Sequence, residues 1–100
     1  MEKTSLFYMA NLYPEIGRML SFFDQGKLEA SSNAQKRALG IVEHIFSFDD
    51  IKPAGREEWN VIYNFILGYT KLDSYERQIL EKYAEPFSYK FLKQYATTTS

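Results

Sequence analysis

The side chain best suited to metal binding or proton transfer is His44, because it is the only histidine and the chain has no cysteine. A metal site needs several ligands that converge on one point, whereas Glu43 and Ser47 are simply neighbours of His44 on one expected helix face. The absence of cysteine also excludes a thiolate nucleophile and a disulfide framework. We therefore expect an exposed His44 that binds no metal, and we predict no cofactor.

Paired acidic residues occur at two places, Asp49-Asp50 and Glu57-Glu58. General acid–base catalysis requires two carboxyl groups whose pKa values are separated by different environments. Adjacent acids near expected helix ends are explained more simply by helix capping and solvation. No motif positions a base to activate a serine or threonine, and the glycines form no phosphate-binding loop. The sequence therefore predicts a protein that is not an enzyme.

Aromatic rings alternate with cations near the C-terminus, where residues 87–95 include Lys90 and Lys93 and no acidic residue. Such a run can stack on single-stranded bases. Two lysines neutralise few phosphates, however, and helical DNA-binding elements carry denser basic faces. We favour a terminal helix whose rings pack on the rest of the protein, and we retain nucleic-acid contact through this segment as an alternative.

Aromatic residues make up 17% of the chain, more than a core of this size easily accommodates. Contiguous apolar patches rarely exceed roughly a few hundred Å² on monomers, and Tyr and Phe are enriched at interface cores. We therefore expect a homo-oligomer or a complex with another protein, unless the last helix folds back over the first and covers these rings. The candidate interface residues, most of which project off the expected apolar faces, are Phe7, Phe22, Tyr89, Leu92 and Tyr95.

Apolar residues recur with the period of a helix through most of the chain, which predicts an all-α protein. Thr4, Ser32 and Asp73 are the expected N-caps, and Gly26 is expected to end the first helix. We expect one domain spanning residues 1–100, a four-helix up-down bundle with a short extra C-terminal helix. The expected helices span residues 5–24, 32–48, 54–70, 73–85 and 86–95.

Two prolines fall inside apolar patterns, and we predict different outcomes for them. Pro14 lies on the polar side of the first expected helix and the apolar seam keeps its phase, so we expect a bend. Around Pro86 the pattern changes, because Tyr75 and Ile79 are expected to face inward whereas Tyr89 appears on the formerly polar side. We therefore expect Pro86 to end its helix. The seam of the first helix is Leu6, Met9, Tyr13, Ile16, Leu20 and Phe23.

The stretch of residues 56–71 is apolar around most of its helical circumference, with Trp59 and Ile66 on its main face. A helix of this kind needs neighbours on several sides, so we expect it to be the central helix. Asn60 and Asn64 lie one turn apart on its polar stripe. Plain exposure is the simplest interpretation; under another helix they would fix its register, and in a cleft they would line it.

The formal net charge is −1 and the charges are well mixed, so no global field favours nucleic acid or an anionic membrane. The first residues do not resemble a signal peptide, and no stretch reaches the roughly 18 apolar residues of a membrane span. We expect a cytoplasmic protein that serves as a non-catalytic protein–protein interaction or oligomerisation module. The alternatives are a regulator that contacts nucleic acid through its C-terminal segment and, more weakly supported, a helical enzyme or ligand carrier with an aromatic-lined pocket.

Overall fold

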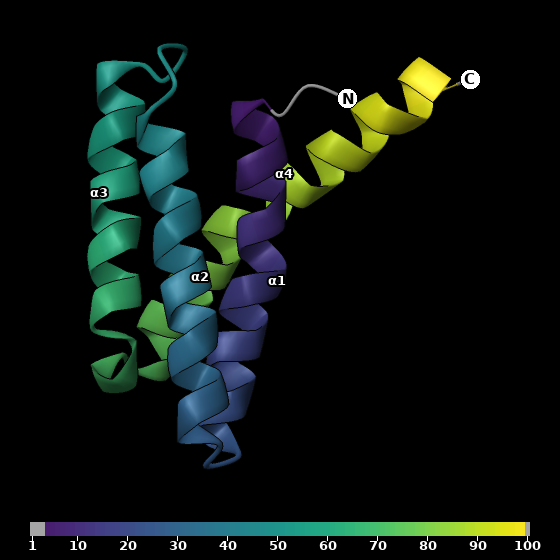
Figure 1. The fold of residues 1–100 in the computed structure, drawn as a ribbon. Coiled ribbons are helices and arrows are strands. Elements are labelled where there is room, and N and C mark those ends of the chain that lie inside the picture. The colour runs from purple at the N-terminus through teal and green to yellow at the C-terminus, as the bar shows by residue number, and fades with distance from the viewer. Residues whose placement is uncertain (1–3, 100) are drawn as a thin grey trace.

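The computed structural model describes the backbone of residues 4–99 and the side chains of residues 4–93. The described part is all-α, which confirms the predicted fold class, and successive helices run in alternating directions. The first three helices lie side by side and the fourth crosses behind them (Figure 1). The elements are α1 (Ser5–Asp24), α2 (Leu28–Phe46), α3 (Pro53–Leu67), the 3₁₀ turn η1 (Tyr69–Lys71) and α4 (Ser74–Thr99).

Three of the expected helix boundaries form the capping interactions that their residue types suggest. The backbone N–H of Phe7 donates to Thr4 Oγ1 at 3.3 Å, which caps α1. At the start of α4, the N–H of Glu76 donates to Asp73 Oδ1 at 2.8 Å, and the N–H of Asp73 donates to Glu76 Oε1 at 3.0 Å. Gly26 has a φ of 75° and follows the end of α1, where a residue with a Cβ would be strained.

The predicted start of α2 at Ser32 is wrong, because the helix already begins at Leu28. Its N-cap residue, Lys27, makes no side-chain capping bond. The left-handed Gly26 reverses the chain within two residues, so no longer connection is needed before the next helix. The two serines therefore lie inside the helix, and the hydroxyl of Ser31 is used for a tertiary contact.

The predicted ends of α2 and α3 fall two and three residues too late, since these helices end at Phe46 and Leu67. After α3 the chain tightens into the separate turn η1. This turn places the side chain of Tyr69 in the core, against Phe23. The tertiary contacts of Tyr69 therefore end α3 earlier than its apolar periodicity suggests.

Ser31 joins three parts of the protein through one fully buried hydroxyl group. Its Oγ donates to the backbone carbonyl of Met19 in α1 at 2.7 Å, and it lies 2.7 Å from the hydroxyl of Tyr69 in η1. Because the serine hydroxyl has a single proton, the Tyr69 hydroxyl donates to it. The two bonds connect α1, α2 and η1 at the same point.

Replacing Ser31 with Ala is expected to lower the free energy of unfolding by about 1 to 3 kcal/mol, because two buried polar groups lose their partner. Chemical denaturation of the variant and the wild type measures this difference. Ser32→Ala is the matched control, since Ser32 is only partly buried and makes none of the structure's side-chain bonds to another helix. The double variant Ser31→Ala/Tyr69→Phe should lose less stability than the two single variants added together. Equal losses at both serines would contradict the assignment.

The central helix of the bundle is α1, because the two most extensive helix–helix contacts, those with α2 and with α4, both involve it. The expectation that residues 56–71 form the central helix is wrong: α3 packs mainly on α2, at the edge of the layer (Figure 1). Val61 and Leu67, on α3, are each about half exposed. The buried residues of α1 are Ser5, Met9, Ala10, Leu12, Ile16, Met19 and Leu20.

The prediction that Pro86 ends its helix is also wrong, because α4 continues through it to Thr99 and residues 86–95 are part of α4 rather than a separate helix. The buried seam of α4 passes from Leu80 and Ala84 to Phe87 and Phe91, with spacings of four, three and four residues. This seam keeps its phase, and Pro86 lies on the opposite, exposed side. Its missing N–H therefore leaves a carbonyl that water can reach. The helix changes direction part-way along its length instead of ending (Figure 1).

Pro14 is likewise inside a continuous helix, as predicted for α1. It is exposed, and Ile16 on the other side of the helix is fully buried. Both prolines thus occupy the solvent side of a helix whose apolar face is uninterrupted.

Candidate interaction surface

One side of α4 collects most of the exposed large apolar side chains in the described part of the chain. Positions 75, 79, 82, 86 and 89 follow one another at spacings of four, three, four and three residues, so they form one stripe along the helix. Leu92 extends the stripe at its edge. We call this surface the outer stripe of α4; its residues are Tyr75, Ile79, Lys82, Pro86, Tyr89 and Leu92.

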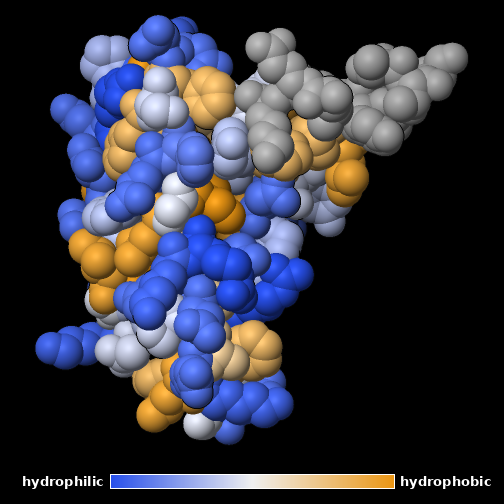
Figure 2. All heavy atoms as spheres, viewed as in Figure 1, coloured by the Kyte–Doolittle hydropathy of each residue, from blue (hydrophilic) through white to orange (hydrophobic). Residues whose placement is uncertain are grey.

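Three apolar members of the outer stripe are highly exposed, whereas Ile79 is 39% exposed. The exposed fraction is 70% for Tyr75, 67% for Tyr89 and 60% for Leu92. On the face formed by α1, α2 and α3, by contrast, the apolar patches are small and separated by hydrophilic residues (Figure 2). The outer stripe is therefore the feature of the described surface that most resembles an unoccupied contact.

The opposite side of α4 packs its rings into the bundle. Phe87 lies 5.5 Å from Trp59 of α3 and 5.7 Å from Tyr83, measured between ring centroids. Phe91 lies 5.8 Å from Phe7 of α1 in an edge-to-face arrangement. These contacts anchor α4 on both α1 and α3, and they determine that the outer stripe faces away from the bundle.

The five candidate interface residues thus have different environments. Tyr89 and Leu92 are exposed, as the sequence suggested, whereas Phe7 is half-buried against Phe91. Phe22 is also half-buried, and the ammonium group of Lys27 lies 5.9 Å from the centroid of its ring. The side chain of Tyr95 lies outside the described residues. The interpretation in which the last helix covers the first therefore applies to Phe7 but not to the outer stripe.

Sequence reasoning missed Tyr75 and Ile79, which were expected to face inward. The signal that identifies them is the seam of Leu80, Ala84 and Phe87, because a face defined by these residues excludes positions 75 and 79. Both exposed and buried sides of α4 carry aromatic residues. Hydrophobicity alone therefore could not distinguish the two sides.

The rings of α4 that face the bundle weaken the hypothesis that the C-terminal segment contacts nucleic acid. Phe87 and Phe91 belong to the run that was considered for base stacking, yet both pack on other rings of the bundle. The ammonium group of Lys90 lies 6.0 Å from the Phe87 centroid. Among the rings of this run whose side chains the structure describes, only Tyr89 is exposed. A single exposed ring is a poor platform for stacking bases.

Tyr83 supports the orientation of α4 through its hydroxyl group, which donates to Glu58 Oε2 at 2.8 Å. Burial raises the pKa of Tyr83 well above its ordinary value of 10.0, and the hydrogen bond to the Glu58 carboxylate raises it further. Above about pH 10 the unfolded chain loses the Tyr83 proton while the folded chain retains it. The stability that Tyr83 contributes is therefore complete below pH 10 and is lost as the pH rises toward the folded pKa.

We accordingly expect the wild type to lose stability between about pH 10 and pH 12, and Tyr83→Phe to lose less across the same range. The measurement is the denaturation midpoint as a function of pH for both proteins. Tyr75→Phe is the control, because Tyr75 is largely exposed and should follow the wild type. A Tyr83→Phe profile as steep as that of the wild type would contradict this role of Tyr83.

Asn60 and Asn64, the candidate polar stripe, are both exposed on the outer side of α3. Each lies on the opposite side of the helix from the buried residues Ile62 and Ile66. Neither amide is covered by another helix, so the structure places them where the simplest interpretation expected them.

His44 is exposed and its imidazole stacks on the ring of Tyr8, with centroids 4.7 Å apart and planes inclined by 9°. A shallow surface hollow of about 280 Å³ lies beside it, lined by Gly40, Glu43 and Ser47. Among the described residues, no group of three or more His, Asp or Glu side chains is placed to hold a metal ion. The absence of metal binding at His44 remains a prediction.

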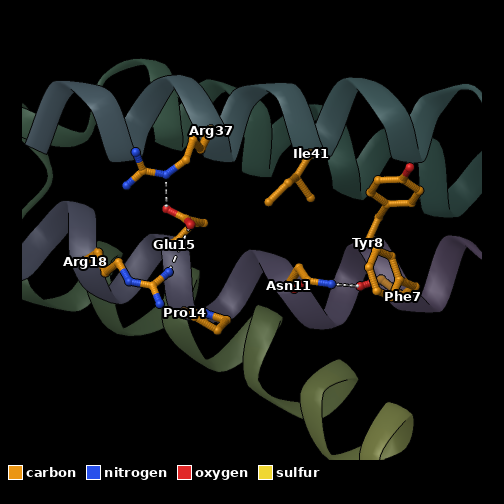
Figure 3. Close-up of a pocket in the computed structure, with 8 residues that line it drawn as sticks. All are labelled: Phe7, Tyr8, Asn11, Pro14, Glu15, Arg18, Arg37 and Ile41. Atoms are coloured by element: carbon orange, nitrogen blue, oxygen red, sulfur yellow. Dashed lines mark hydrogen bonds and ion pairs between the residues drawn. The ribbon is translucent and has the colours of Figure 1, made fainter. Parts of the chain in front are cut away.

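A larger groove of about 390 Å³ lies between α1 and α2 (Figure 3). Its charged centre is Glu15, which accepts hydrogen bonds from Arg18 Nη1 and Arg37 Nε, each at 2.9 Å. The side chain of Asn11 donates to the carbonyl of Phe7 at 2.7 Å. The polar side chains of this groove thus already have partners within the protein, and the bond between Arg37 and Glu15 joins α2 to α1. They give little support to the ligand-carrier alternative.

No helix within the described residues is long and apolar enough to cross a membrane. No protein-family model matches the chain, and comparisons with curated proteins and with solved structures also find no match. The fold and the surface together define an all-α four-helix protein with an exposed apolar stripe on its crossing helix. Any function must therefore be argued from these features.

Proposed function

We propose that the protein is a non-catalytic interaction module that binds a protein chain through the outer stripe of α4. The observation that carries this proposal is the set of exposed side chains Tyr75, Ile79, Tyr89 and Leu92 on one side of a single helix. Together with Lys82 and Pro86, which lie between Ile79 and Tyr89, they follow the spacing of three and four residues with which a helix packs against another helix. Burying such groups against an apolar partner removes them from water, which favours association.

The two alternatives are less well supported by the side chains of the described residues. The rings of Phe87 and Phe91 face the bundle, where they are unavailable to stack on bases. In the groove beside Glu15, both guanidinium groups are bonded to the Glu15 carboxylate, which gives little support to a ligand site or a reaction there. We place the interaction in the cytoplasm, since a chain without cysteine is compatible with a reducing compartment.

A photo-cross-linking experiment tests this proposal. Tyr89 is replaced by the photoreactive residue p-benzoylphenylalanine, the protein is illuminated in cell extract, and the trapped protein is identified by mass spectrometry. The matched control carries the same residue in place of Val61, which is about half exposed on α3. We expect position 89 to trap one protein that position 61 does not.

The trapped protein is then purified and titrated against the wild type and against Tyr89→Glu. Binding that is reproduced with the purified wild type and weakened by Tyr89→Glu supports the proposal, whether the trapped chain is this protein or another. Equal trapping at positions 89 and 61, or binding that is unaffected by Tyr89→Glu, contradicts it.

A further inference from the structure

We infer that the outer stripe of α4 binds an acidic, amphipathic segment of a different protein, which places a carboxylate opposite Lys82. This inference rests on the proposed interaction function and specifies the chemistry of the partner. It follows from the charges that α4 exposes and from the position of Lys82 along the stripe.

The exposed charged side chains of α4 are all positive among residues 74–93. They are Lys82, Lys90 and Lys93. The ammonium group of Lys90 lies 6.0 Å from the Phe87 centroid, and Lys93 also has an interaction within the protein. Lys82, by contrast, makes no hydrogen bond or ion pair with the described residues. It is therefore the cation of α4 that is most accessible to a partner.

The acidic side chains of α4 lie toward the bundle and off the outer stripe. Glu76, Glu81 and Glu85 are all only partly exposed. Glu76 belongs to the cap of the helix, and Glu85 Oε2 accepts a hydrogen bond from the hydroxyl of Tyr13 of α1 at 3.4 Å. The outer stripe of a second copy would therefore present cations rather than carboxylates to Lys82, which indicates that the partner is a different chain.

Lys82 lies between apolar members of the outer stripe. Ile79 precedes it by three residues, and Pro86 and Tyr89 follow at spacings of four and three. Positions 79 and 89 are ten residues apart, about 15 Å along a helix. An apolar partner that covered this stretch without an acid would bury an unpaired ammonium group, which is costly. The partner therefore needs a carboxylate with apolar groups on both sides of it.

This order of residues favours a protein segment over the other anionic partners. On a helix that lies in a membrane surface, the cations occupy the face opposite the apolar residues, whereas Lys82 lies within the apolar stripe. Nucleic acid is bound by several cations that each contact a phosphate. A helix with one acidic residue in its apolar face offers the required order, and its periodicity matches the spacing of the stripe.

The charge of the partner is tested with the protein trapped at position 89, purified and titrated against wild type, Lys82→Glu and Lys82→Gln. We expect Lys82→Glu to weaken binding at least about tenfold, because it brings two carboxylates together. Lys82→Gln should weaken binding less, and raising the ionic strength should affect it less than the wild type. Lys36→Glu is the matched control, because Lys36 is exposed on α2 and the variant has the same net charge. It should bind like the wild type.

The contact itself is tested by cross-linking with a carbodiimide, which joins an amine directly to a neighbouring carboxylate. We expect mass spectrometry of the complex to find Lys82 joined to an Asp or Glu of the trapped protein. Vesicles of phosphatidylcholine and phosphatidylserine, and poly(dT), are titrated in parallel with wild type and Lys82→Glu. We expect neither to show binding that depends on Lys82.

The outcomes separate this inference from the proposed function. If the trapped protein binds Lys82→Glu as tightly as the wild type, forms no link with Lys82, or is a second copy of this chain, the acidic partner is refuted and the interaction function stands. Binding of the vesicles or of poly(dT) that is lost in Lys82→Glu would assign the stripe to a membrane or to nucleic acid and would also refute the acidic partner. If position 89 traps nothing specific, the interaction function itself fails, and this inference fails with it.

Discussion

Replacing Trp59 with Ala is expected to lower the free energy of unfolding by about 3 to 5 kcal/mol, the range for a buried aromatic residue. Trp59 is almost fully buried, and its ring contacts Tyr83 at 5.1 Å and Phe87 at 5.5 Å. Because Trp59 belongs to α3 and both of its ring partners belong to α4, the truncation leaves a cavity where the two helices meet. Urea denaturation followed by circular dichroism measures the change.

The control for this prediction is Tyr75→Ala, which removes a ring of similar size from an exposed position. It should change the stability by no more than about 0.5 kcal/mol at a concentration at which the protein is monomeric. If Trp59→Ala cost less than about 1 kcal/mol, the contact between α3 and α4 would not be a core contact.

Replacing Leu12 with Ala is expected to lower the free energy of unfolding by about 2 to 5 kcal/mol. Leu12 is fully buried in α1, the helix that packs against both α2 and α4, so its loss leaves a cavity inside the bundle. The same substitution at Leu67, which is about half exposed on α3, should cost less than about 1 kcal/mol. The comparison is made by equilibrium denaturation of both variants. Similar costs at the two leucines would contradict the central position of α1.

Local features of the sequence were sufficient to predict helices and several of their ends. Thr4, Asp73 and Gly26 act through contacts with residues close to them in the chain, so their roles can be inferred without the fold. Ser32 has the same local pattern but does not begin a helix, because α2 already starts at Leu28, directly after the reversal at Gly26. Within that helix, the hydroxyl of Ser31 finds partners in α1 and η1. Such distant partners are not encoded in local spacing.

The packing order of the helices was harder to predict. The expected seam of α1 included Tyr13 and Phe23, which are only half-buried, and omitted Leu12 and Met19, which are fully buried. A helix between two neighbours buries a wider face than one seam, and the sequence does not reveal the number of neighbours. For α3 the sequence predicts too many neighbouring helices. Aliphatic residues such as Val61 suggest that helices cover them, whereas Val61 is about half exposed.

The outer stripe of α4 was only partly predictable from the sequence, because it depends on which side of α4 faces the bundle. Tyr89 and Leu92 were identified because they depart from the expected face of their helix, and both are exposed. If Pro86 is taken as a helix end, the apolar pattern before it predicts that Tyr75 and Ile79 face the core. When α4 is treated as one helix, its seam and its outer stripe both run through the proline.

Hydrogen–deuterium exchange in the associated state most directly tests the claim that the outer stripe of α4 is the interaction surface. The associated state is the concentrated protein or, if position 89 traps another protein, the complex with that protein. Relative to the dilute monomer, we predict slower exchange in peptides from residues 74–93 and unchanged exchange in peptides from α3. Slower exchange in α3 with none in residues 74–93 would contradict the account.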